Sequence, residues 1–184
     1  MQQIDDIQKH LEEKSRNLAK YEEMSKKIPL PFKRFDKGLP ALYRDNVRNA
    51  GFDLFARIPE PITVEPGQVV FIPLNVATDI PPFAVGLVFQ RSSTFRKWKV
   101  MLTNGVGVID SLYCGDNDEW GAEFINLTNE TTVINPGDKV CQAVFLPLLP
   151  VNPVEVDELG NADRGGYGTS FDNAKALGGK AGEQ

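Results

Sequence analysis

Apolar residues recur at a spacing of three and four along the first 28 residues of the chain. Such spacing places one apolar stripe along a helix, and the residues that form it are Ile4, Ile7, Leu11, Leu18 and Tyr21. Lys14 interrupts the stripe, and Pro29 and Pro31 follow it. The pattern predicts an amphipathic helix over residues 1–28. Two interpretations remain open: a solvated helix that lies on the next domain, or a short coiled coil between subunits.

From about residue 50 the pattern changes to short β-prone runs that are separated by turn signals. The turns include Glu65-Pro66-Gly67, Pro81-Pro82 and Asn135-Pro136-Gly137-Asp138. Many short strands at this spacing predict an all-β sandwich, barrel or jelly roll instead of alternating βα units. The predicted strands are Phe52–Arg57, Ile62–Glu65, Gln68–Leu74, Val85–Gln90, Phe124–Leu127, Thr131–Asn135 and Lys139–Leu146.

Composition limits the classes of protein that the chain can belong to. Its 184 residues, 41% of them hydrophobic, suffice for one domain with a core, and we predict a helix over 1–28, a β domain over 29–160 and a Gly-rich arm over 161–184. No apolar run approaches the roughly 20 residues that a membrane span needs. Two cysteines indicate no disulfide framework, which favours a reducing cytoplasm. The net charge of −5 argues against direct nucleic-acid binding.

Five short segments carry Gly and polar residues where plain strands would carry apolar ones. Each segment alone is compatible with a simple turn or loop. The segments are Ala50-Gly51-Phe52-Asp53-Leu54, Arg91-Ser92-Ser93, Asn104 to Asp110 with the following Tyr113-Cys114-Gly115, Pro136 to Gln142, and Arg164-Gly165-Gly166-Tyr167-Gly168-Thr169-Ser170.

In this order the segments resemble the five motifs of the trimeric dUTPase family, and the likeness runs through residues 39–170. The third segment is the most specific, because the family pattern of Asn, Asp, Tyr and Gly is matched by Asn104, Asp110, Tyr113 and Gly115. The subgroup that this chain is most similar to comes from phages and prophages of Gram-positive bacteria. That subgroup has an insertion like Gly115–Trp120 and an ending like Gly160–Gly166.

The resemblance implies a jelly-roll protomer, or distorted β-barrel of the dUTPase type, with the helix added at its N-terminus. It implies a homotrimer with active sites at subunit junctions, over which the C-terminal arm closes. It also implies hydrolysis of dUTP to dUMP and pyrophosphate, with Mg²⁺, by water attack on the α-phosphate. Such an activity limits uracil in DNA and supplies dUMP for dTMP synthesis.

The third segment would then bind the nucleoside. Asn104 would hydrogen-bond the uracil edge, since an amide offers both a donor and an acceptor. Tyr113 would lie against the deoxyribose and leave no room for a 2′-hydroxyl. Asp110 would hold the 3′-hydroxyl and orient the attacking water as general base. The resemblance assigns substrate binding also to Gly107, Ile109 and Gly115.

The first, second and fourth segments would bind the triphosphate. Arg91, Ser92 and Ser93 would donate to phosphate oxygens, because an Arg fork suits that geometry. Gln142 would contact the phosphate chain or the nucleophilic water. Asp53 would act through waters of a Mg²⁺ ion that substrate phosphates hold, so no direct protein ligand of the metal is expected.

The fifth segment would close over the nucleotide. Tyr167 stands where the family usually has a Phe that stacks on uracil, and a Tyr can stack equally well. Gly168, Thr169 and Ser170 would contact the γ-phosphate region. Arg164 directly precedes the Gly-Gly pair, as in the phage-like subgroup, and its reach to the γ-phosphate is left open.

The acidic insertion admits two interpretations. Asp116, Asp118 and Glu119 lie within four residues, which is compatible with Ca²⁺ binding, but the loop lacks the spacing of an EF-hand. We therefore expect a solvated turn over Asp116–Trp120. Cys141 falls in an apolar strand and is expected in the core.

Two other functions are retained as alternatives. The first is dCTP deamination, alone or combined with dUTP hydrolysis, because the deaminases share this fold and Glu123 is a candidate proton shuttle. The second is a nucleotide-gated phage regulatory protein that binds a host or phage partner through the helix or the insertion. A phage-encoded protein of either kind would act in the host cytoplasm.

Overall fold

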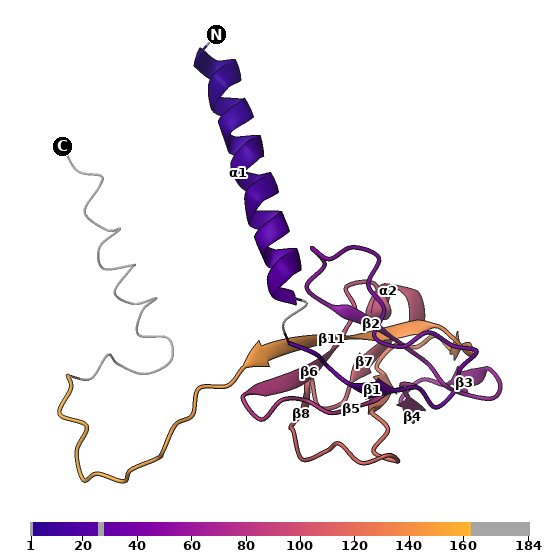
Figure 1. Ribbon diagram of the computed structural model, residues 1–184. Helices are drawn as coiled ribbons and strands as arrows, with labels where there is room; N and C mark the ends of the chain where they lie inside the picture. The colour runs from indigo at the N-terminus through magenta and orange to yellow at the C-terminus, as the bar shows by residue number, and fades with distance from the viewer. Residues whose placement is uncertain (1, 26–27, 163–184) are drawn as a thin grey trace, which may run out of the picture. The chain divides into compact units, whose positions relative to one another are not determined.

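The computed structural model describes residues 2–25 and 28–162. Within these residues the N-terminal helix α1 (Gln2–Ser25) confirms the predicted helix, and the Ile7 and Leu11 side chains are more than half exposed (Figure 1). Whether the apolar stripe lies on the β domain or joins subunits stays a prediction. No helix in the described ranges has both the length and the apolar character needed to cross a membrane.

Apart from one short helix and the connecting loops, the remaining elements of the described structure are antiparallel strands (Figure 1). The larger sheet has the strand order β2 (Phe52–Phe55), β11 (Lys139–Pro147), β6 (Ala84–Gln90) and β8 (Gly107–Ile109). A second sheet has the order β4 (Val69–Pro73), β9 (Gly121–Asn126) and β7 (Val100–Leu102). Two short pairs complete the fold, β3 (Ile62–Val64) with β10 (Thr132–Ile134) and β1 (Phe32–Lys33) with β5 (Ala77–Thr78).

The core takes alternate side chains from the strands, as the period of two along a strand requires. In β9, for example, Ala122, Phe124 and Asn126 are buried, whereas Glu123 between them is exposed. Burial of this apolar surface is the main favourable contribution to folding. The largest fully buried side chains are Trp120, Phe124, Leu54, Ile72, Leu74, Ile80 and Ile134.

Two buried amides connect the loops to this core. The Asn75 side-chain nitrogen donates to the carbonyls of Asp36, Leu39 and Pro40, and its oxygen accepts from the Asp36 N–H at 2.7 Å. Asn126 donates to the Val64 carbonyl at 3.0 Å. Because a buried amide is costly unless it is hydrogen-bonded, these contacts fix the loops that they reach.

All seven predicted strands are found, with ends displaced by a few residues, and the predicted all-β architecture is confirmed. Four strands, β1, β5, β7 and β8, and the short helix α2 (Thr94–Trp98) were not predicted. The expectation of a solvated turn over Asp116–Trp120 is wrong at its C-terminal end, because Trp120 has no exposed surface. The chain divides into two units at Pro150–Val151, and the predicted domain limits at residues 28 and 160 stay predictions.

Candidate active site

A polar cavity of about 370 Å³ opens beside strands β2, β11 and β6. Register explains the convergence, because Gln142 on β11 lies opposite Asp53 on β2, and Cys141 lies opposite Gln90, the last residue of β6. The first, second and fourth sequence segments therefore meet at one place. The residues that line the cavity are Arg44, Asp45, Asn49, Ala50, Gly51, Asp53, Arg91, Ser92, Lys139 and Gln142.

Asp53 holds two cations of this cavity in place. One carboxylate oxygen lies 2.8 Å from Arg91 Nε and the other lies 2.9 Å from Lys139 Nζ, and the Asp53 side chain is 18% exposed. Each carboxylate oxygen keeps a further acceptor site, since the group offers about four lone pairs. With Arg44, the lining has three cations against the two carboxylates of Asp45 and Asp53, so the cavity favours an anionic ligand.

Thr94 fixes the Arg-Ser-Ser segment at the end of β6. The Arg91 N–H donates to Thr94 Oγ1 at 3.0 Å, and the Thr94 hydroxyl donates to the Val140 carbonyl of β11 at 3.0 Å. Ser92 is exposed at the cavity, and Ser93 precedes α2 with its hydroxyl outside any capping bond. Thr94, which directly follows Ser93, was missed from the sequence, and Lys139 lies within the fourth segment but was assigned no role.

Gln142 reaches the cavity from the middle of the larger sheet. Its side-chain nitrogen donates to the Gln90 carbonyl at 3.3 Å. That bond leaves the amide oxygen of Gln142 free for a ligand in the cavity. Cys141, the preceding residue, points the other way into the core, and burial raises the pKa of its thiol to about 12. The prediction of a core cysteine is confirmed.

The third segment comprises the exposed turn between β7 and β8, strand β8 and the turn that follows it; β7 and β8 belong to different sheets and are not paired with each other. Asn104 lies in the turn between β7 and β8, and Gly105 has a φ of 69° there, a conformation that favours glycine. Gly107 on β8 pairs with Val88 on β6, where a Cβ on residue 107 would lie 3.1 Å from the Val88 Cβ. Ile109 follows in the same strand and packs against the core.

Asp110 and Tyr113 occupy the turn after β8. Asp110 is exposed, and one of its carboxylate oxygens accepts from the Leu112 N–H at 2.8 Å. The Tyr113 hydroxyl donates to the Glu119 carbonyl at 3.0 Å. Gly115 follows, and its N–H donates to the Asp118 carboxylate at 2.7 Å.

The structure thus brings Asp53, Arg91, Ser92 and Gln142 together at the cavity. Among the described residues, those that line the polar cavity include none from the third segment. The predicted residues Arg164, Tyr167, Gly168, Thr169 and Ser170 lie outside the described residues. In the described part of the chain, no three His, Cys, Asp or Glu side chains gather as a metal site.

The fold and the cavity define a mostly-β protein with a polar cavity in which cationic side chains outnumber carboxylates. A sequence model of the dUTPase family matches residues 39–171. The SPbeta prophage-derived deoxyuridine 5′-triphosphate nucleotidohydrolase of Bacillus subtilis is 38% identical over 128 residues, which cover 69% of this chain and 89% of that protein. The chain belongs to the dUTPase family.

Solved structures agree with this assignment. The dUTPase of Streptococcus mutans is 31% identical, with a TM-score of 0.57 over 66% of this chain and 98% of that one. A mutant dUTPase of Staphylococcus aureus phage phi11, known for its coordination of a structural Mg(II) ion, has a TM-score of 0.63 and covers 73% of this chain and 100% of its own. At 24% identity the second likeness shows the fold alone.

Proposed function

We propose that this chain hydrolyses dUTP to dUMP and pyrophosphate in the presence of Mg²⁺. The observation that carries the proposal is the convergence of Asp53, Arg91 and Gln142 from three neighbouring strands on one cationic cavity, in a member of the dUTPase family. Pyrophosphate release from dUTP, measured against dTTP, dCTP and UTP, tests it. Release from dUTP at a rate no greater than from dTTP would contradict the proposal.

The cavity would bind the phosphate chain. Arg91 and Lys139 supply positive charge, and both are oriented by Asp53, so their donors are already in position before a ligand arrives. The exposed Ser92 hydroxyl and the free amide oxygen of Gln142 add a donor and an acceptor at the wall of the cavity.

The donor set fits a metal that arrives with its substrate. Asp53 keeps acceptor sites that could hold metal-bound waters, while the remaining ligands of Mg²⁺ are usually phosphate oxygens and water. When bound, Mg²⁺ would neutralise phosphate charge and stabilise the pyrophosphate leaving group. A structural Mg(II) ion in the phage phi11 relative supports the choice of this cation without assigning its ligands here.

The third segment would bind the nucleoside. Asn104 is exposed in its turn, where its amide is available to a uracil edge. Asp110 has one carboxylate oxygen engaged by the Leu112 N–H, which orients the second oxygen for a 3′-hydroxyl or a water. We assign Asp110 the role of general base and Tyr113 the role of sugar selection, because each stands at its position in the family motif.

We further propose that a complete site needs a second protomer, as in a homotrimer. The support is that, among the described residues of one chain, no residue of the third segment lines the phosphate-type cavity. Exposed apolar side chains on the outer face of β4 and β7, namely Val69, Phe71 and Met101, offer surface for another copy.

Subunit mixing tests this assembly. Asp110→Asn and Arg91→Ala should each inactivate the enzyme. Their co-expression should restore a fraction of activity, because one chain supplies an intact third segment and the other supplies an intact cavity. Light scattering on the same sample gives the molar mass. A monomer, or a mixture without restored activity, would contradict shared sites.

The C-terminal arm is proposed to close over the bound nucleotide. Deletion of residues 162–184 should lower turnover, because Tyr167, Thr169 and Ser170 would no longer contact the substrate. The melting temperature should stay close to that of the full chain, because every buried core residue in the described part of the chain precedes residue 150. A large fall in melting temperature would contradict a purely catalytic role for the arm.

The alternatives keep separate tests. Glu123, the candidate proton shuttle of a dCTP deaminase, is exposed on β9 and accepts from the Thr103 hydroxyl at 2.8 Å, and the relatives are named as dUTP nucleotidohydrolases. Ammonia release from dCTP would support the alternative of a dCTP deaminase. A regulatory protein partner and a cytoplasmic location stay predictions. Nucleotide-dependent capture of one purified candidate partner would test the former.

A further inference from the structure

The loop that joins Tyr113 to Trp120 is attached to the core at its C-terminal end. Trp120 is fully buried, its N–H donates to the Val76 carbonyl at 2.8 Å, and its own carbonyl accepts from the Leu74 N–H at 2.8 Å. These two backbone bonds make Trp120 part of the packed structure. Glu119, the residue before it, is therefore held close to the core.

The Glu119 carboxylate is also fixed through its side chain. Arg57 meets it with both arms of its guanidinium fork, Nε to Oε1 at 2.7 Å and Nη2 to Oε2. The Asn75 N–H donates to Oε1 at 2.9 Å. The Glu119 side chain is 13% exposed, so these are charge-assisted bonds in a partly dehydrated place, where bidentate Arg contacts are geometrically the most specific.

Arg57 is itself held at its backbone. It follows strand β2, and its N–H donates to the Pro73 carbonyl at 2.8 Å. The hydrogen bond to Glu119 is the largest of the influences that raise the pKa of Arg57 above its ordinary value, which opposes the effect of burial. The pair is thus an ion pair that joins the segment after β2 to the insertion across 62 residues of sequence.

The same Glu119 accepts the phenol of Tyr113 at its carbonyl oxygen. The hydroxyl donates at 3.0 Å, and the Tyr113 side chain is 40% exposed. A ring that is this open to solvent would otherwise turn about χ1 and χ2. With Glu119 fixed at its side chain and at the following peptide, the phenol has a fixed acceptor, so the ring has a preferred place.

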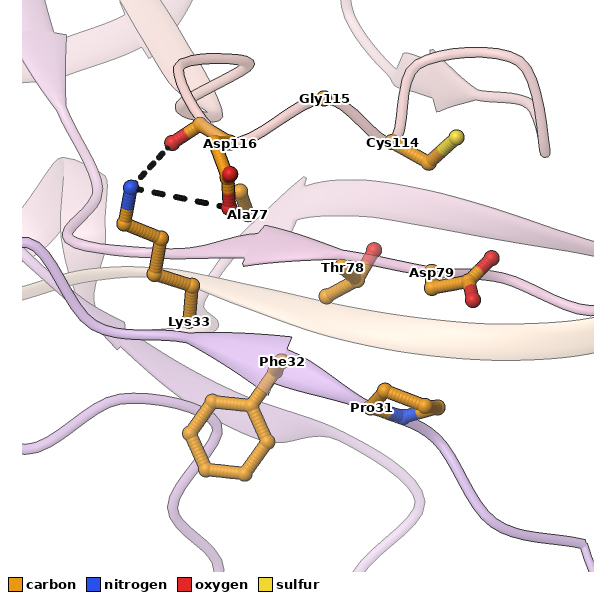
Figure 2. Close-up of a pocket in the computed structure, with 9 residues that line it drawn as sticks. All are labelled: Pro31, Phe32, Lys33, Ala77, Thr78, Asp79, Cys114, Gly115 and Asp116. Atoms are coloured by element: carbon orange, nitrogen blue, oxygen red, sulfur yellow. Dashed lines mark hydrogen bonds and ion pairs between the residues drawn. The ribbon is translucent and has the colours of Figure 1, made fainter.

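The far end of the loop is attached separately. Lys33 donates from Nζ to the Asp116 carbonyl at 2.6 Å and lies 3.9 Å from its carboxylate (Figure 2). Figure 2 shows this contact beside Ala77 of strand β5, and both Lys33 and Asp116 line a small cavity there. Lys33 therefore restrains the tip of the loop, whereas Arg57 restrains the base that carries the acceptor of Tyr113.

We propose that the Arg57–Glu119 ion pair sets the position of the Tyr113 ring and thereby the preference for deoxyribose over ribose, an inference that rests on the proposed dUTP hydrolysis. Exclusion of a 2′-hydroxyl by crowding requires a ring that does not yield. A displacement of about 1 Å is enough to change such a contact. Arg57 and Glu119 are positioning residues in this proposal, because Glu119 contacts Tyr113 and Arg57 contacts Glu119.

The test compares kcat/KM for dUTP and for UTP in four variants. Arg57→Met keeps the bulk and removes the fork, Glu119→Gln keeps the shape and removes the charge, and Tyr113→Phe removes only the phenol hydroxyl. Each should lower the dUTP:UTP ratio by about tenfold, and for Arg57→Met and Glu119→Gln kcat for dUTP should change by less than about threefold. Lys33→Met, the matched control at the other end of the loop, should leave the ratio unchanged.

The double variant Arg57→Met/Tyr113→Phe makes the coupling explicit. If the ion pair acts through the phenol, the two changes together should lower the ratio no further than either does alone. Multiplied effects, or an unchanged ratio in folded Arg57→Met and Glu119→Gln, would overturn the inference. An equal loss of both activities would also overturn it, because that is the result of a merely structural role.

Measurements on the wild-type protein distinguish a failure of the proposed dUTP hydrolysis from a failure of the inference about Arg57 and Glu119. Absence of dUTP turnover in the wild type overturns the proposed function and this inference with it. Normal dUTP turnover with an unaltered ratio in the variants overturns the inference alone. Should Arg57→Met fail to fold, the dUTP:UTP ratio of the conservative Glu119→Gln variant decides whether the inference holds.

Discussion

The backbone of Gly51 lies directly against the side-chain amide of Gln142. A Cβ on residue 51 would lie 3.2 Å from the Gln142 Cβ and closer still to its amide oxygen. Gly51 immediately precedes β2, and Gln142 is in β11, the strand that pairs with it. The absence of a side chain at residue 51 therefore leaves room for the Gln142 amide at the cavity wall.

Gly51→Ala should displace the amide of Gln142 without unfolding the protein. The atom in the way is the far end of a flexible side chain, which can move to another rotamer. Because Gln142 would no longer meet the phosphate chain or the water in the right geometry, we expect kcat for dUTP to fall by about 10- to 100-fold. The melting temperature should change by no more than about 4 °C.

A double-variant cycle isolates this contact. Gln142→Ala should lower kcat to a similar extent, and Gly51→Ala/Gln142→Ala should be no worse than Gln142→Ala alone. Independent, multiplied losses would mean that Gly51 acts on catalysis by some other route.

Asp53→Asn should distinguish the role of Asp53 in orienting Arg91 and Lys139 from its contribution to the charge of the cavity. The change preserves shape but removes the partner of Arg91 and Lys139, both within 3 Å of the carboxylate. It also makes the cavity more positive, so nucleotide binding should not weaken through charge. We expect kcat to fall, KM to change little, and the free energy of unfolding to drop by about 1–2 kcal/mol, since these pairs are only partly buried.

Steady-state kinetics and urea unfolding measure these effects. Asp45→Asn is the matched control, because Asp45 lines the same cavity but does not pair with Arg91 or Lys139. Full turnover in Asp53→Asn would show that Asp53 does not orient the catalytic cations.

The sequence was sufficient to predict seven of the eleven strands in the described part of the chain. Alternating apolar positions and Pro-Gly turns are local signals, so β3, β4, β6 and β11 were predicted within a few residues. Strands such as β5, which has two residues, carry no periodicity that a sequence could reveal. Their formation depends on the partner strand instead.

Contacts between distant residues were the part that sequence reasoning missed. Trp120 follows three acids, which predicted a solvated turn, yet it is core because Val76 and Leu74 pair with its backbone. Likewise, Glu119 meets Arg57 across 62 residues. The motif resemblance assigned Asn104 and Asp110 to one nucleoside-binding segment, but only the structure shows that no residue of this segment lines the phosphate-type cavity.

Asp110→Asn should lower turnover by about two orders of magnitude or more, with little change in nucleotide affinity. The amide keeps the shape and an acceptor for the Leu112 N–H, but it lacks the basicity to take a proton from water. Single-turnover kinetics and calorimetry with a nonhydrolysable dUTP analogue measure the two quantities. Asp116→Asn, an exposed acid in the neighbouring loop, is the control and should keep its activity. Near-normal turnover in Asp110→Asn would show that Asp110 is not the general base.

Alkaline pH should destabilise the protein through Cys141. Burial raises the pKa of this thiol from its ordinary 9.0 to about 12, so above pH 9 the unfolded chain loses a proton that the folded chain retains. The unfolded state then binds fewer protons, and the free energy of unfolding falls as pH rises, by at most about 1.4 kcal/mol per pH unit, until the folded thiol ionises as well. Other groups titrate in this range, so the measurement is the difference between the wild type and Cys141→Ala in urea unfolding from pH 8 to 11. The wild type should lose stability more steeply than the variant above pH 9, whereas parallel curves would mean that the thiolate is tolerated inside the core.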